Sequence, residues 1–127
     1  MSVAPECRVE DPLQLTCTAV LPGSIQTIRW SIFRVINDQG TLSEITNSVL
    51  IDNSDVHQRK SKEVASVTFT YARISAQGAS PLVSTLMIDS VSVGLNGTVV
   101  RCSDVANPMI SASTTIYIPA ANSTMTL

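Results

Sequence analysis

Residues 84–103 constrain the fold of this chain most, because they predict a strand, a turn and a returning strand. Apolar side chains alternate with polar ones on both sides of the turn, as they do in half-buried strands. Gly94 and the Asn96-Gly97 pair supply turn residues between the two strands. The inward rows are Leu86, Ile88 and the later Val91 on the first side, and Thr98, Val100 and Cys102 on the second.

The inward position of Cys102 calls for a partner across a core, and two earlier segments supply matching rows. Cys17 belongs to an alternating run that begins at Leu13, so it faces inward in the same way. Residues 25–36 predict a long strand in which Trp30 shares its face with two isoleucines.

The order Cys17, Trp30, Cys102 resembles the immunoglobulin fold, where an inter-sheet disulfide packs on a buried tryptophan. Residues 86–91 match the family motif L-x-I-x-x-V. The second motif, D-x-G-x-Y-x-C, departs from the family where the sequence has Asn96, Thr98 and Val100. The resemblance implies an all-β, immunoglobulin-like Greek-key β-sandwich of two antiparallel sheets, joined by a disulfide between the two cysteines.

The resemblance implies one domain over residues 1–118, with 119–127 as a polar C-terminal linker. A chain of 127 residues, 44% of them hydrophobic, is long enough for one such core. Residues 37–40 predict a hairpin that returns as a strand over 42–49, which favours a variable-like domain.

The remaining segments complete the predicted sandwich. Residues 1–12 predict a partial edge strand broken by proline, and the polar residues 50–61 predict a surface segment. Two further strands are expected to start at Leu82 and to cover 111–118, with a loop over 103–110 between the last two strands. Residues 64–71 predict one strand whose inward row is Ala65, Val67, Phe69 and Tyr71.

Composition and motifs argue against several function classes. A net charge of −2 gives no electrostatic attraction for nucleic acid or an anionic membrane, and no apolar run is long enough to span a bilayer. His57 has no recognisable nucleophile beside it, so no enzyme activity is expected. Residues 52–55 could offer oxygens to calcium but lack the rest of an EF-hand loop, and zinc would lack ligands. We therefore expect no metal and no cofactor.

Two marks predict an extracellular setting: the disulfide and the N-x-S/T sequons at Asn96 and Asn122. Each asparagine is either a glycosylation site or a plain turn residue. Cys7 is the odd cysteine, which leaves three alternatives open: a buried thiol, a partner lost with a missing segment, or an intermolecular disulfide in a dimer.

The resemblance implies a recognition or adhesion module of a cell-surface receptor, similar to divergent domains of invertebrate receptors, with a receptor tyrosine kinase ectodomain as one candidate parent. It would bind a protein ligand or a second copy of itself through a sheet face and loops. The candidate anchors are Phe33, Val35, Pro108 and Met109, although Phe33 and Val35 could instead pack under a neighbouring loop. The alternative is a structural spacer, since a fold does not decide function.

Overall fold

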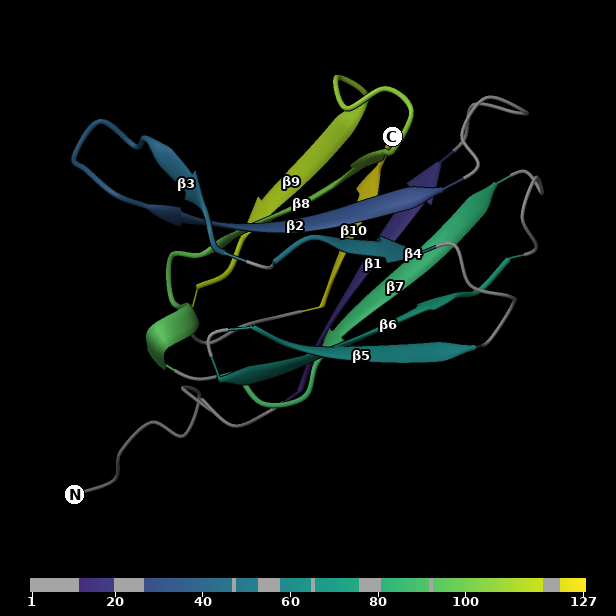
Figure 1. Cartoon of the computed structure of the whole chain (residues 1–127), viewed down its shortest axis with the longest axis horizontal. Helices are drawn as coiled ribbons and strands as arrows, with labels where there is room; N and C mark the ends of the chain where they lie inside the picture. The colour runs from purple at the N-terminus through teal and green to yellow at the C-terminus, as the bar shows by residue number, and fades with distance from the viewer. Residues whose placement is uncertain are drawn as a thin grey trace.

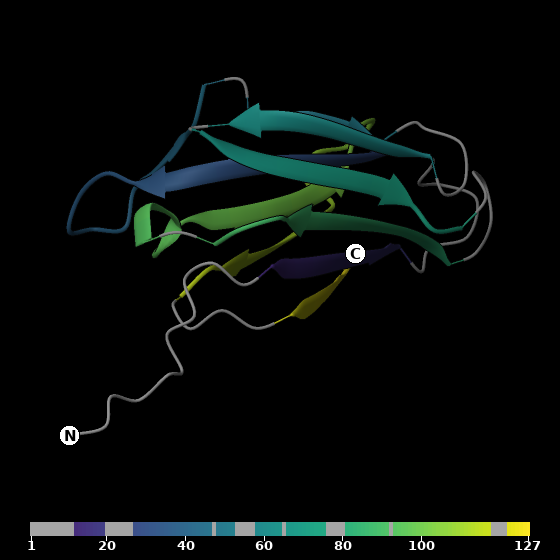
Figure 2. The same cartoon turned by 90° about the horizontal axis from the view of Figure 1, so that it is seen from below.

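The computed structural model describes residues 12–19, 27–46, 48–52, 58–64, 66–75, 81–91, 93–117 and 122–127. Within them the chain forms ten strands and one short 3-10 helix, arranged as two stacked sheets (Figures 1 and 2). The elements are β1 (Leu13–Ala19), β2 (Ile28–Val35), β3 (Leu42–Glu44), β4 (Leu50–Asp52), β5 (Arg59–Val64), β6 (Val67–Arg73), β7 (Leu82–Ile88), η1 (Val93–Leu95), β8 (Val99–Asp104), β9 (Ser111–Thr115) and β10 (Ser123–Thr126).

The first sheet has the order β10-β1-β7-β6-β5, and the second has the order β3-β2-β8-β9, with β4 also paired to β2. A disulfide joins Cys17 on β1 to Cys102 on β8, with 6.5 Å between their Cα atoms. The predicted all-β sandwich with an inter-sheet disulfide is therefore confirmed. All strand pairs are antiparallel except β10 with β1, which is parallel.

Alternation of buried and more exposed residues along the strands explains how the two sheets pack face to face. Strands β1 and β7 bury every second residue, as expected for strands with one face on the core. The predicted inward row of β2 is also confirmed, because Ile28, Trp30 and Ile32 are fully buried. The core is aliphatic around one tryptophan and one phenylalanine, Phe69, which fits a sequence that is only 4% aromatic.

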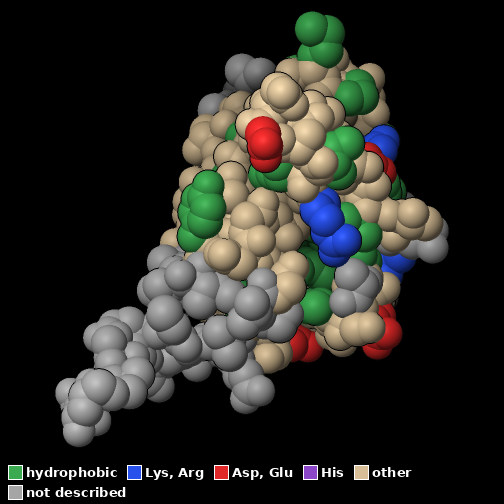
Figure 3. Space-filling view, turned by 90° about the vertical axis from the view of Figure 1, so that its left-hand side faces the viewer, with side chains coloured by type: hydrophobic (Ala, Val, Ile, Leu, Met, Phe, Trp, Pro, Cys, Tyr) green, Lys and Arg blue, Asp and Glu red, His purple; other side chains and the backbone are tan. Residues whose placement is uncertain are grey.

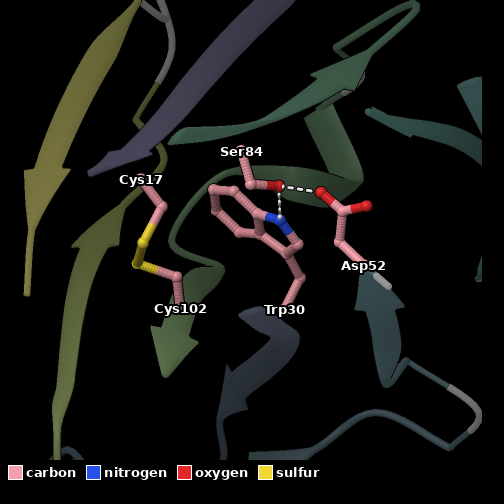
Figure 4. Close-up of a disulfide and its surroundings, with 5 residues drawn as sticks. All are labelled: Cys17, Trp30, Asp52, Ser84 and Cys102. Carbon is pink, nitrogen blue, oxygen red and sulfur yellow. Dashed lines mark hydrogen bonds between the residues drawn. A yellow bond between two sulfur atoms is a disulfide. The ribbon is translucent and has the colours of Figure 1, made fainter. Parts of the chain in front are cut away.

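A chain of hydrogen bonds runs from the core tryptophan to a buried carboxylate (Figure 4). The indole nitrogen of Trp30 donates to the Ser84 hydroxyl at 3.1 Å, and that hydroxyl donates to the Asp52 carboxylate. Arg73, which is also buried, donates to the backbone carbonyl of Asp52. Burial raises the pKa of the Tyr71 phenol, and the negative charge of Asp52 raises it further.

The buried position of Asp52 corrects the expectation that residues 50–61 lie on the surface. Leu50 and Asp52 are both buried, and residues 59–64 form strand β5. The predicted strand over 42–49 is also wrong beyond β3, because the chain turns at 45–48 and returns to β2 as β4. At this turn the Ser48 hydroxyl donates to the Ile32 carbonyl at 3.1 Å, where a strand would have used its backbone.

The single strand predicted over residues 64–71 is instead a tight hairpin between β5 and β6. Val64 pairs with Val67, and Ser66 adopts a positive φ of 66° at the turn. A turn this short needs a left-handed residue, and the sequence carries no glycine there to mark it. Of the predicted inward row, Phe69 is buried and Tyr71 packs partly against the core, whereas Ala65 is outside the described residues.

The expectation of a linker over 119–127 is wrong for its last part, which forms a strand. Residues 123–126 form β10 and pair in parallel with β1, with Thr16 opposite Thr124 and Cys17 opposite Met125. Met125 is buried against the core, and Asn122 caps the start of the pairing by accepting a hydrogen bond from the Gln14 amide at 2.9 Å. Met125 and Leu127, at the end of an otherwise mostly polar tail, carry too little periodic signal to predict a strand.

Candidate interaction surface

The outer face of the second sheet carries the predicted anchors on β2 and can be built from strand register. Phe33 lies opposite Glu44 on one side and Val99 on the other, and Val99 lies opposite Thr115. Val35 lies opposite Leu42. Because directly opposite residues point to the same face of a sheet, these side chains form neighbouring rows on the outside of the sandwich.

Phe33 is half-buried beneath a cation rather than beneath a loop. The Arg101 guanidinium carbon lies 4.6 Å from the centre of the phenyl ring, a cation–π arrangement. Arg101 lies on β8 opposite Ser31, two residue pairs along the sheet from Phe33 and Val99, so it reaches over the ring from the neighbouring strand. The contact covers an apolar ring on the outer face of the sheet with a charged side chain.

An exposed apolar patch lies where the β2–β3 hairpin and η1 come together. We call it the hairpin-end patch and define it by Phe33, Val35, Leu42 and Tyr117, with the buried Val99 opposite Phe33 beneath it. Val35 is 44% exposed and Tyr117 65% exposed, and both line a shallow hollow together with Asn96. Figure 3 shows this end of the molecule, where hydrophobic side chains form separate islands beside charged ones. Tyr117 was missed from the sequence, although it continues the outward alternation of β9.

The structure does not bring all four predicted anchors together. Val35 ends β2 at the hairpin, whereas Pro108 and Met109 lie in the loop after β8. This loop lies at the other end of β2, because its Val105 amide donates to the carbonyl of Thr27, just before β2 begins. The length of β2 therefore separates the two pairs by roughly 20 Å. Met109 is 92% exposed and stands apart from the patch. The single surface predicted from these four residues is two surfaces.

The two sequon asparagines are both exposed but lie in different parts of the molecule. Asn96 is in the turn after η1, where Gly97 has a positive φ of 83° that favours glycine, so the predicted turn is confirmed. Asn96 also lines the hollow of the hairpin-end patch. Asn122 adjoins β1, and Cys7 and His57 are outside the described residues.

Within the described part of the chain, no helix is long and apolar enough to cross a membrane, and no three potential metal ligands converge. No protein-family model, no curated protein and no solved structure matches the chain.

Proposed function

We propose that this chain is an extracellular immunoglobulin-like recognition domain that binds a protein partner through the hairpin-end patch. The sandwich, the inter-sheet disulfide and the tryptophan packed between the sheets support the immunoglobulin-like assignment. A disulfide persists in oxidising surroundings, which supports a secreted or cell-surface setting. A receptor or adhesion protein is the parent we favour for such a domain.

The observation that carries this proposal is the set of side chains that surrounds Tyr117 and Val35. Both are exposed around one hollow, beside a phenylalanine that an arginine covers. Tyrosine, phenylalanine and arginine are enriched in protein interfaces, and tyrosine and arginine are enriched among the residues whose truncation costs most binding energy. Only two side chains of the patch, Val35 and Tyr117, are largely exposed, which fits a transient cell-surface contact better than a permanent subunit interface.

The test compares a patch variant with a control at the far end of the same sheet. Tetramers of the domain are applied to a panel of extracellular domains from the source organism, with wild type, the double variant Val35→Ser/Tyr117→Ala and the control Met109→Ala. We expect the patch variant to bind at least about 10-fold more weakly, since truncating a central anchor typically costs more than 1 kcal/mol. Met109→Ala should bind as wild type does.

Equal unfolding midpoints for the three proteins ensure that the comparison reports binding and not folding. Wild-type affinity in the patch variant would contradict the proposed surface. Loss of binding only in Met109→Ala would move the surface to the loop after β8. If the wild type binds nothing in the panel, the spacer role is the better account.

A further inference from the structure

The edge strands of this sandwich differ sharply in how they are protected. Strand β5, at one edge of the first sheet, carries Arg59, Lys60, Lys62 and Glu63. Strand β3, at one edge of the second sheet, has three residues. Charges and short length both discourage pairing with another chain. The two remaining edge strands, β9 in the second sheet and β10 in the first, have no charge, proline or glycine, and β9 is the longer, with five residues against four.

The backbone groups on the outer side of β9 follow from its hydrogen bonds to β8. The Asp104 amide donates to the Ile110 carbonyl at 3.0 Å, and the Ile116 amide donates to the Thr98 carbonyl at 2.8 Å. In an antiparallel pair the bonded residues alternate, so the groups of Ala112 and Thr114 also face β8. The amides and carbonyls of Ser111, Ser113 and Thr115 therefore point away from the sheet.

We propose that β9 pairs antiparallel with β9 of a second copy of this chain, centred on Ser113. In this pairing Ser113 lies opposite Ser113 of the second copy, and Ser111 lies opposite Thr115 of the second copy. Each of these residues contributes the outward amide and carbonyl that a strand pair requires. The opposed side chains are small and uncharged, so no like charges meet across the two-fold axis. Among the described strands none pairs with this side of β9.

A second copy fits this edge because the pattern of outward groups is symmetric about its central residue. An isologous dimer requires such self-complementarity, whereas a different partner does not. The contact concerns a strand edge and goes beyond the proposed function, which uses the outer face. A few backbone hydrogen bonds between exposed strands make a small interface, so we expect a weak dimer that depends on concentration.

The first experiment places a charge at the centre of this edge. Sedimentation equilibrium is recorded from micromolar to near-millimolar protein for wild type, Ser113→Lys and the control Ser43→Lys. Ser43 is exposed on β3, at the opposite edge of the same sheet, so the control adds the same charge to the same sheet. We expect wild type and the control to have the same dimer dissociation constant. For Ser113→Lys this constant should be at least about 10-fold higher.

Amide exchange followed by NMR reports the edge directly and does not depend on a variant. On going from dilute to concentrated protein, the amides of Ser113 and Thr115 should gain protection, while those of Ala112 and Thr114, already bonded to β8, should not change. This odd-even pattern is specific to pairing at the β9 edge.

Three results would overturn the proposal. One is a wild type that stays monomeric over the whole concentration range. Another is dimerisation of Ser113→Lys with wild-type affinity at an unchanged unfolding midpoint. The third is strong protection of the Ser113 amide already in the dilute monomer, which would mean that the chain covers this edge itself.

Discussion

At the scale of single residues, the most consequential side chain that the sequence left unmarked is Ser84. It faces inward on β7, between the indole of Trp30 and the carboxylate of Asp52, and its hydroxyl both accepts from the first and donates to the second. Placing a tryptophan and a carboxylate in a core is favourable only when their polar atoms have partners. The serine supplies one hydroxyl that serves both.

Ser84→Ala should lower the free energy of unfolding by about 2–3 kcal/mol, because it leaves the buried indole N–H without this acceptor and removes a donor from a buried carboxylate. Urea-induced unfolding measures the change. The exposed strand residue Ser43, replaced by alanine, is the control and should stay within about 0.5 kcal/mol of wild type. Equal effects of the two substitutions would mean that the hydrogen-bond chain contributes little.

At the scale of elements, the unexpected feature is the placement of β10. It adds to the outer edge of β1 in parallel, so the end of the chain completes the first sheet after β9 has completed the second. Its pairing continues in the Leu127 amide, which donates to the Thr18 carbonyl at 2.8 Å. The strand buries only Met125, so that side chain should carry most of the apolar contribution of β10.

Met125→Ala should therefore destabilise the domain by about 2–3 kcal/mol, the low end of the range for a buried methionine, since a strand at the edge can partly collapse onto the cavity. Thr126→Ala, at an exposed position of the same strand, is the matched control. Thermal unfolding monitored by circular dichroism compares the two. A Met125 variant as stable as its control would show that burial of this side chain contributes little to the stability of the domain.

At the scale of the whole molecule, the sandwich decides which surface elements act together. The turn that carries Asn96 lies beside the hairpin-end patch, although 61 residues separate Asn96 from Val35 in the sequence. Asn122, the other sequon, lies against the first sheet. A glycan on Asn96 would therefore stand at the rim of the proposed binding surface, and a glycan on Asn122 would not.

Secretion from eukaryotic cells should yield a domain glycosylated at Asn96, seen as a loss of mass on enzymatic deglycosylation that Asn96→Gln abolishes. Because the glycan crowds the patch, we expect Asn96→Gln to bind a patch partner more tightly, and Asn122→Gln to leave that affinity unchanged. An unaltered mass after deglycosylation would mean that Asn96 is a plain turn residue. Tighter binding by Asn122→Gln alone would argue against this position of the patch.

The sequence by itself determined the parts of this protein that depend on alternation within one strand. The inward rows of β1, β2 and β7 and the hairpin at 37–40 follow from a two-residue period and from turn chemistry. The pairing of Cys17 with Cys102 around Trp30 was implied by the resemblance to the immunoglobulin fold. Only the tertiary structure decided where β4 and β10 pair, that Asp52 is buried beside Ser84, and that Val35 and Met109 lie at opposite ends of one sheet. The physical reason is that a strand of three or four residues gains its stability from pairing with an edge that distant residues provide. A buried carboxylate likewise needs a donor, and here the donor Ser84 comes from the opposite sheet. Neither partner can be read from the local pattern.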